Sequence, residues 1–328
     1  MEIKLTNFSS VSSGVTLPKK NVKLLIIGSG PAGLSAALYA ARADLKPVVL
    51  TGTEMGGQVS LTYIVENYPG FPEGIGGAEL IEKFKQQAEH FGAVFEFDSA
   101  VEVNLSKSPF YVRTYQNEYF AEAMIIATGA SAVHLNVPGE TELTGRGVSY
   151  CATCDGWFFK EKDVIVVGGG DSALEESLFL TRYAKSVTII HRRDSLRAGA
   201  ILKNRAAANP KIHFIMNSIV TNILGEDAVK SVKLKNVVNG EIFDHPTDGV
   251  FIFIGHTPNT QLFEGQLEMD DRKYIRINHL MQSSVPGVYV AGEAADPHFR
   301  QVITSAGMGA AAAMQAIHFL QDRVEISS

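Results

Sequence analysis

The fold is decided by the segment Asn21–Ala43, NVKLLIIGSGPAGLSAALYAARA. A short apolar stretch turns through Gly28, Gly30 and Gly33 into an alanine-rich run of helical character. In such a strand–turn–helix unit the first glycine permits the tight turn, the second lets a pyrophosphate approach the backbone, and the third lets helix and strand pack closely. Free N–H groups at the start of the helix then meet the phosphate charge. The segment therefore predicts a Rossmann-like α/β unit that binds a dinucleotide.

The same pattern returns at Asp163–Asp194, DVIVVGGGDSALEESLFLTRYAKSVTIIHRRD. Gly168, Gly170 and Ala173 take the three positions, and alanine in third place still packs closely. The alternative, a glycine turn that only joins a strand to a helix, is disfavoured by the matching context on both sides. Two such units in one chain predict two bound nucleotides.

The two units differ where their next strand ends. In the second unit the strand SVTII is followed by basic residues: His191, Arg192, Arg193 and, about a turn later, Arg197. An acid at this place binds a ribose 2′-hydroxyl, whereas arginines accommodate a 2′-phosphate. The second unit therefore predicts NADP(H), with a solvated basic loop as the alternative. In the first unit the strand KPVVL ends at Thr51, where only Glu54 is near, so the usual ribose acid is missing.

Length and composition indicate a soluble protein of two domains. A chain of 328 residues exceeds one typical hydrophobic core, and 45% hydrophobic with 20% charged residues is ordinary for a soluble globular protein. The net charge of −6 disfavours nucleic acid and acidic membrane surfaces as partners. No continuous apolar run reaches the roughly 20 residues of a membrane-spanning helix. Residues 1–20 are serine-rich and lack the apolar core of a signal peptide, so we expect a loose arm on a cytoplasmic protein.

The late segment 283–320 contains a strand, an acidic turn and a long alanine-rich helix. It resembles nothing between residues 160 and 250, so we expect it to return to the first domain. The second nucleotide unit is then inserted in the first, with crossings near residues 130 and 259 where Gly129, Gly255 and Pro258 suit linkers. The expected divisions are an arm at 1–20, a first domain at 21–130 and 259–328, and an inserted domain at 131–258.

Both cysteines of the chain lie in SYCATCDGWFF, residues 149–159. A structural disulfide is disfavoured in reducing cytosol, and a structural zinc site needs four ligands although no second C-x-x-C follows. We therefore expect no metal and favour a redox dithiol formed by Cys151 and Cys154. Asp155, directly behind the pair, could shuttle the proton that thiol exchange requires. It could also cap a helix or turn, and both roles can hold together.

Nine motifs in order resemble the low-molecular-weight, bacterial-type thioredoxin reductases of the pyridine nucleotide-disulfide oxidoreductase class: GSGPAG, MGGQ, VENYPGFP, ATGAS, CATCDG, GGGDSA, HRRD, IGHTPNT and RQVITSAGMG. The resemblance runs from about residue 22 to 320. It implies FAD in the first domain, NADPH in the inserted domain, a homodimer and a thioredoxin or thioredoxin-like partner. It also implies Cys151, Cys154 and Asp155 as the catalytic residues, with Cys154 nearer the flavin.

The resemblance also assigns the cofactor contacts. For FAD they are Gly28, Ser29, Gly30, Ala32, Gly33, Thr51, Gly57, Gln58, Asn67, Gly292, Glu293, Arg300, Gln301 and Val302. For NADPH they are Gly168, Gly170, Asp171, Ser172, Ala173, His191, Arg192, Arg193 and Arg197. Glu293 departs from the aspartate usual in the family and is longer by one methylene.

The resemblance further implies that the inserted domain rotates between two half-reactions, because nicotinamide and disulfide both need the flavin. His256 lies near this hinge and is more often a structural group than a functional one. Trp157, Phe158 and Phe159 could shape a docking surface, although we expect core packing for at least one of them.

Two other functions remain open. One is a flavoprotein disulfide reductase for a different acceptor, whose members usually carry a long additional N-terminal domain. The other is a flavin redox sensor. The cysteine pair, Asp155 and the arginines argue against the sensor.

Overall fold

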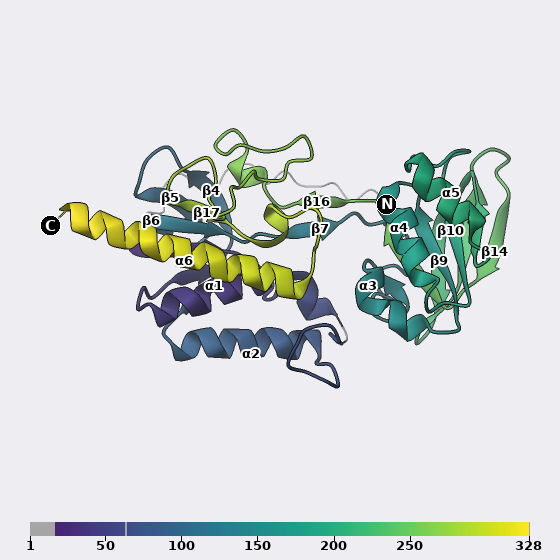
Figure 1. The fold of residues 1–328 in the computed structure, drawn as a ribbon, viewed down its shortest axis with the longest axis horizontal. Coiled ribbons are helices and arrows are strands. Elements are labelled where there is room, and N and C mark those ends of the chain that lie inside the picture. The colour runs from purple at the N-terminus through teal and green to yellow at the C-terminus, as the bar shows by residue number, and fades with distance from the viewer. Residues whose placement is uncertain (1–16, 63, 328) are drawn as a thin grey trace, which may run out of the picture. The chain divides into compact units, whose positions relative to one another are not determined.

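The structure is a computed structural model that describes residues 17–62 and 64–327. The chain divides into two compact units, traced in Figure 1. Unit 1 consists of the described residues up to Gly57, of Lys83–Gly129 and of the described residues from Thr260 on. Unit 2 consists of Gln58–Glu82 and Ala130–Asn259. The predicted α/β fold, with one unit inserted into the other, is confirmed.

Unit 1 is built on a seven-stranded sheet in the order β3-β2-β1-β6-β5-β4, with β17 pairing to β6. Its strands are β1 (Lys19–Ile27), β2 (Val48–Leu50), β3 (Val94–Glu96), β4 (Ala100–Asn104), β5 (Phe110–Thr114), β6 (Glu118–Ile126) and β17 (Val288–Val290). β17 runs parallel to β6, so the late strand returns to the first unit as expected. In β1, Leu24 and Ile26 belong to one core cluster while Leu25 and Ile27 belong to another. The strand is therefore covered on both faces, and a continuous apolar run is typical of such strands in parallel sheets.

The helices of unit 1 are α1 (Pro31–Arg42), α6 (Val302–Ser327) and the second part of α2 (Gly77–His90). α6 packs against α1 at Gly309, where an added Cβ would lie 2.0 Å from the carbonyl oxygen of Ala32. The small residues of α6 therefore serve a close helix–helix contact. Among the described residues, Val302–Arg323 is long and apolar enough to cross a membrane by length and composition alone. The sequence did not predict this, because polar residues interrupt the apolar run.

Unit 2 contains a five-stranded sheet in the order β11-β10-β9-β15-β8 and a separate antiparallel sheet in the order β12-β13-β14. The first sheet consists of β8 (Val148–Ser149), β9 (Asp163–Gly168), β10 (Ser186–Ile190), β11 (Ile212–Ile215) and β15 (Gly249–Phe253), all parallel. The second consists of β12 (Ser218–Gly225), β13 (Val229–Asn236) and β14 (Ile242–Pro246). The helices are α3 (Ala152–Asp155), α4 (Asp171–Leu180) and α5 (Ala200–Ala208). Unit 2 also has the short 3-10 turn η2 (Gly156–Phe159), unit 1 has η3 (Gln261–Phe263) and η4 (Gly292–Ala294), and η1 (Gly57–Leu61) lies where the two units meet in the sequence.

The two crossings between the units form a short antiparallel ribbon. β7 (Ala130–Ala132) pairs with β16 (His256–Pro258). Gly129 and Gly255 flank the ribbon with φ of +67° and +132°, a region that favours glycine. His256 is therefore a residue of this ribbon, where its backbone pairs with Ala132.

Two details differ from the expected divisions. β1 begins at Lys19, so the strand includes the last two residues assigned to the arm, while residues 1–16 lie outside the described residues. Gln58–Glu82 groups with unit 2, although we expected it in the first domain. The division then falls inside α2, so this helix belongs to both units.

Candidate active site

The first glycine turn joins β1 to α1. Gly28 has φ of +115°, and an added Cβ would lie 2.2 Å from the carbonyl oxygen of Ala127. A Cβ on Gly33 would lie 1.9 Å from the carbonyl oxygen of Gly28, so both positions require glycine. A Cβ on Gly30 would meet no heavy atom within 4 Å. Gly28 and Gly33 are therefore needed by the fold, whereas Gly30 keeps space open above the start of α1.

Ser29 fixes the loop beside this turn. Its side chain is buried and its hydroxyl donates to the carbonyl oxygen of Thr51 at 3.0 Å. The same Oγ accepts the N–H of Gly56 at 3.2 Å. The Thr51 hydroxyl donates to its neighbour Gly52. Both side chains, assigned to FAD by the resemblance, thus hold the segment between β2 and η1.

The late turn of the chain lies against the start of α1. Gly292 has φ of +72°, and an added Cβ would lie 3.0 Å from the Cβ of Ala32. Burial raises the pKa of Glu293 to about 7, although the Arg300 guanidinium opposes this rise. The fold therefore brings together the Gly28–Gly33 turn and the Gly292 turn, which are far apart in the sequence.

Asp296, which the sequence analysis missed, organises the approach to α6. Its buried carboxylate accepts the N–H groups of His298, Phe299 and Arg300 at 2.8, 3.0 and 3.3 Å. An aspartate that accepts N–H groups two to four residues ahead is ordinary turn chemistry, and the Asp-Pro dipeptide was the available signal. This turn leads into Gln301 and Val302, where α6 begins.

Three further residues assigned to FAD lie in the segment between β2 and α2, namely Gly57, Gln58 and Asn67. Gly57 begins η1, while the side chains of Gln58 and Asn67 are exposed. Gln58 and Asn67 belong to Gln58–Glu82 and so to unit 2, whereas the other residues assigned to FAD belong to unit 1.

The second glycine turn joins β9 to α4 in the same way. A Cβ on Gly168 would lie 2.5 Å from the carbonyl oxygen of Phe253 and 2.6 Å from the Cβ of Ala173. A Cβ on Gly170 would again meet nothing within 4 Å. The middle glycine, Gly169, faces the ring of His191, whose Nδ1 would lie 2.3 Å from an added Cβ.

His191 is thus a residue beneath the turn. It is 5% exposed, and burial lowers its pKa, so the neutral ring is favoured. Within the described residues its Nε2 has no hydrogen-bond partner.

The arginine loop is fastened to the second turn by its backbone. The N–H groups of Arg197 and Ala198 donate to the carbonyl oxygen of Gly169 at 2.7 and 3.1 Å. The Asp171 carboxylate accepts the N–H of Gly199 at 2.7 Å. Exposed side chains in this region are Arg192, Arg193 and Arg197 on the loop and Ser172 at the start of α4. The loop therefore presents three cations beside the glycine turn, while the Gly169 carbonyl and the Asp171 carboxylate hold its backbone.

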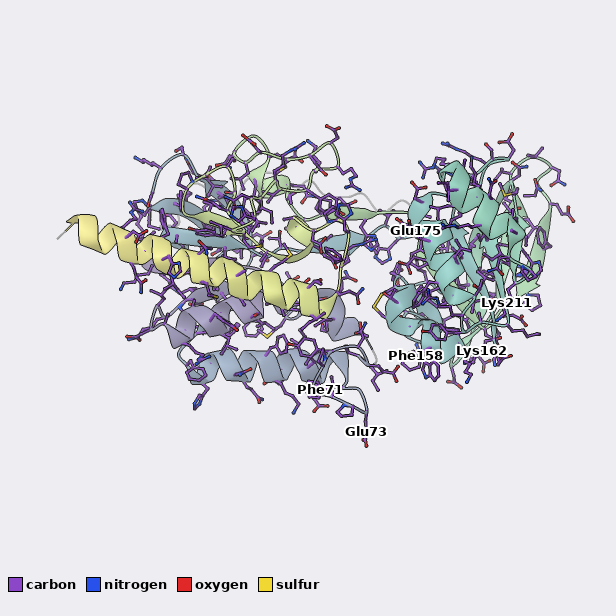
Figure 2. The ribbon with its side chains drawn as sticks, viewed as in Figure 1. Phe71, Glu73, Phe158, Lys162, Glu175 and Lys211 are labelled. Atoms are coloured by element: carbon purple, nitrogen blue, oxygen red, sulfur yellow. A yellow bond between two sulfur atoms is a disulfide. The ribbon has the colours of Figure 1, made fainter. Side chains whose placement is uncertain are left out.

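Cys151 and Cys154 form a disulfide at the start of α3, with Cα atoms 5.3 Å apart (Figure 2). The Cys154 N–H donates to Cys151 Sγ at 3.2 Å. In the part of the chain that the structure describes, no group of three or more His, Cys, Asp or Glu side chains could hold a metal ion.

Asp155 lies at the other end of α3. Its carboxylate accepts a 2.6 Å hydrogen bond from the hydroxyl of Ser149, a residue absent from the predicted site. Burial raises the pKa of Asp155, and the Ser149 hydrogen bond partly opposes this. An acid whose pKa is raised by burial is a candidate for holding and releasing a proton during the reaction.

The aromatic residues behind the pair divide between surface and core. Trp157 is 53% exposed and Phe158 is 38% exposed, whereas Phe159 is buried against Phe251 with ring centroids 5.0 Å apart. Figure 2 labels Phe158 on unit 2. The expectation of core packing for at least one of the three is therefore met by Phe159.

Both glycine turns fit a dinucleotide. Each leads into a helix whose N-cap is glycine, so the first N–H groups of α1 and α4 carry no capping side chain from that position. The space kept open at Gly30 and Gly170 lies at those N-termini. A helix N-terminus with this arrangement suits the negative charge of a pyrophosphate.

Comparison with known proteins agrees with this geometry. The pyridine nucleotide-disulphide oxidoreductase family matches residues 22–312. Thioredoxin reductase of Rickettsia felis is 51% identical, covering 92% of this chain and 99% of the relative, and that of Mycolicibacterium smegmatis is 48% identical, covering 92% and 97%.

Solved structures show the same likeness. Thioredoxin reductase of Streptococcus pyogenes has a TM-score of 0.89 at 42% identity, and that of Lactococcus lactis in its FR conformation has 0.63 at 40%. Each comparison covers 92% of this chain and 99% of the other. The family implies the use of a flavin and of NAD(P). The chain belongs to the pyridine nucleotide-disulphide oxidoreductase family, in its group of low-molecular-weight thioredoxin reductases.

Proposed function

We propose that this chain is an NADPH-dependent thioredoxin-disulfide reductase that uses FAD and passes electrons through Cys151 and Cys154 to a thioredoxin-like protein. The observation that carries the proposal is the disulfide at the start of α3, which shares unit 2 with the second glycine turn. The other glycine turn lies in unit 1. The site for the electron donor NADPH and the disulfide thus belong to unit 2, and the site for FAD belongs to unit 1.

The cofactors divide between the turns according to their surroundings. Arg192, Arg193 and Arg197 stand exposed beside the second turn, where guanidinium groups suit the 2′-phosphate of NADPH. FAD belongs to the first turn, against which the Gly292 turn is packed. When bound, FAD supplies the two-electron carrier between nicotinamide and disulfide.

The pair itself uses thiolate chemistry. A thiolate attacks the disulfide of the partner, and the Cys154 N–H that points at Cys151 Sγ favours negative charge on that sulfur. We assign the position nearer the flavin to Cys154. As the dithiol closes to a disulfide, two electrons and two protons pass to the partner, which leaves as a dithiol. Asp155 is the acid–base residue for one of these protons.

The partner docks on the exposed aromatic residues next to the pair. Trp157 is half exposed, and its ring lies 5.6 Å from that of Tyr183 in an edge contact. Exposed aromatic side chains are enriched at protein interfaces because they bury a large area at low entropic cost. Replacement of Trp157 should therefore raise KM for the thioredoxin-like protein more than it lowers kcat.

Turnover requires unit 2 to rotate on the β7–β16 ribbon, because nicotinamide and disulfide must each reach the flavin. The glycines at both ends of the ribbon support such a hinge. A crosslink between the two units should abolish turnover while both cofactors stay bound, and full turnover would refute the rotation.

The function is tested by mixing the purified protein anaerobically with NADPH and thioredoxins from one genome. We expect rapid NADPH loss with at least one of them, and none with Cys154→Ser. Flavin that is reduced without onward transfer would indicate a different acceptor or a redox sensor. Flavin that stays oxidised would show that NADPH is not the donor.

We also expect a cytoplasmic homodimer. Sedimentation velocity of the purified protein should give about twice the 35.5 kDa of the chain. A monomer with full activity would contradict the dimer.

A further inference from the structure

Ser149 lies two residues before Cys151, and its hydrogen bond to Asp155 has not yet been given a function. It ends β8 and pairs with Phe251 of β15, so its backbone is fixed by the parallel sheet of unit 2. The side chain is buried, with 4% of the residue exposed. A serine hydroxyl offers one donor and two acceptor positions. Here the donor has two alternative acceptors and one acceptor position receives an N–H, and all three partner groups belong to the segment that carries the cysteines.

The contacts of this hydroxyl connect Asp155 to the backbone of Cys151. Ser149 Oγ lies 2.6 Å from the Asp155 carboxylate and 3.2 Å from the carbonyl oxygen of Cys151. It accepts the N–H of Cys151 at 3.1 Å. A second path joins the same groups, because the Asp155 N–H donates to the Cys151 carbonyl at 3.2 Å.

We propose that Ser149 is a positioning residue that holds the Asp155 carboxyl in both of its protonation states, and this proposal rests on the acid–base role proposed for Asp155. With an ionised carboxylate the Ser149 hydroxyl donates across the 2.6 Å contact. With a protonated carboxyl the donor and acceptor exchange, and the hydroxyl proton turns to the Cys151 carbonyl at 3.2 Å. Oγ keeps the N–H of Cys151 throughout, so neither state leaves a buried donor without a partner.

Such a device suits an acid that must both give and receive a proton. An aliphatic side chain at position 149 would leave the carboxylate without this donor and the N–H of Cys151 without this acceptor. The direction of the pKa change agrees, since burial raises the pKa of Asp155 and the Ser149 hydrogen bond lowers it. The elements packed against α3 add further acids on α4, namely Asp171, Glu175 and Glu176. β15 beside Ser149 has the sequence GVFIF and carries no ionisable side chain.

The test compares Ser149→Ala with Ser149→Thr, which keeps the hydroxyl. Ser177→Ala is the matched control. Ser177 is an equally buried serine of unit 2 whose hydroxyl donates to the Ala173 carbonyl at 2.6 Å. Each variant is reduced with NADPH and mixed with a thioredoxin in a stopped-flow instrument over a range of pH.

For Ser149→Ala we expect partner reduction about tenfold slower, which is the usual effect of removing one hydrogen bond to a charged group. The apparent pKa of the step should move upward. Hydride transfer to flavin should be unchanged, Ser149→Thr should restore both values, and Ser177→Ala should match the wild type. An unchanged rate and pH profile in Ser149→Ala would overturn the proposal. So would a loss of rate that leaves the pH profile unmoved and is not restored by threonine.

A second measurement separates this proposal from the proposed function. Reduction of the Cys151–Cys154 disulfide by dithiothreitol, followed against pH, needs neither NADPH nor a thioredoxin. If the wild type fails to reduce thioredoxins, the proposed function fails, and the dithiothreitol profiles still decide the role of Ser149. If the pH profile of dithiothreitol reduction shifts upward in Ser149→Ala and returns to the wild-type profile in Ser149→Thr, the role proposed for Ser149 is supported. If the profiles of Ser149→Ala and the wild type are identical, the proposal is overturned.

Discussion

Glu293 makes the stability of the protein depend on pH in a direction opposite to that of most carboxylates. Its side chain lies in the turn after Gly292, and burial raises its pKa from the ordinary 4.5 to about 7. The Arg300 guanidinium opposes this rise, and Asp296 adds to it. The perturbation we consider is Glu293→Gln, which keeps the length and hydrogen-bonding capacity of the side chain but removes its titration.

The expected magnitude follows from linkage. Below about pH 4.5 the carboxyl is protonated in both folded and unfolded chains, so it does not affect stability. Between about 4.5 and 7 the unfolded chain loses the proton while the folded chain keeps it, so stability falls as the pH rises. Above 7 the loss is complete. A difference of about 2.5 pKa units at about 1.4 kcal/mol each corresponds to about 3 kcal/mol.

The assay is urea unfolding of the flavin-free protein from pH 5 to pH 8, followed by far-UV circular dichroism. The only tryptophan, Trp157, lies in unit 2, so its fluorescence follows that unit separately. We expect Glu293→Gln to be more stable than the wild type by less than about 1 kcal/mol at pH 5 and by about 3 kcal/mol at pH 8. Glu268→Gln, at an exposed position of unit 1, is the control. If Glu293→Gln is no more stable than the wild type at pH 8, the buried carboxyl is not destabilising and the reasoning is wrong.

Three further predictions follow from other contacts. Gly30→Ala should fold with wild-type stability but lose flavin absorbance, because its Cβ would enter only the open space above the start of α1. Gly33→Ala should be less stable by about 1–3 kcal/mol, measured by thermal unfolding, because its Cβ would overlap the backbone of Gly28. Tyr150→Phe should cost about 2 kcal/mol in urea unfolding, because Tyr150 donates at 2.8 Å to the buried carboxylate of Glu140; equal stability would show that the remaining donors suffice. Arg193→Ala should raise KM for NADPH about tenfold with little change for NADH in steady-state kinetics, and an equal effect on both would remove Arg193 from the phosphate site.

Features set by backbone geometry could be predicted from the sequence. Gly28 and Gly33 stand where an added Cβ would overlap a carbonyl oxygen, and the spacing of the motif encodes that requirement. The short apolar stretch before the first glycine turn predicted the strand β1, and the repeat of the motif predicted the second unit. The return of β17 to the first sheet was also predicted, because its neighbours in the sequence did not belong to the inserted unit.

Contacts between distant side chains and backbone groups could not be predicted in this way. Asp171, which the resemblance assigns to NADPH, also accepts the N–H of Gly199, 28 residues later, with its carboxylate. The ring of His191, which the sequence groups with the arginines, lies buried against Gly169. Both contacts depend on where the loop after β10 returns, and no local pattern determines that path. The segment Gln58–Glu82 gives a larger example. Its position in the sequence placed it in the first domain, but its contacts group it with unit 2.

Ser149 shows that a motif can be identified correctly while the role of a residue beside it is not predicted. A serine two residues before a cysteine is compatible with a turn, a cap or a solvent-exposed side chain, and the sequence does not distinguish them. What distinguishes them is burial at the end of β8 together with three polar groups within 3.2 Å. Two of these groups belong to the backbone of Cys151 and the third is the carboxylate of Asp155. Ser149 can contact all three only because the fold brings the Asp155 carboxylate close to the backbone of Cys151. The proposed role of Asp155 therefore depends on Ser149, whose hydroxyl has ordinary serine chemistry and acts through its position.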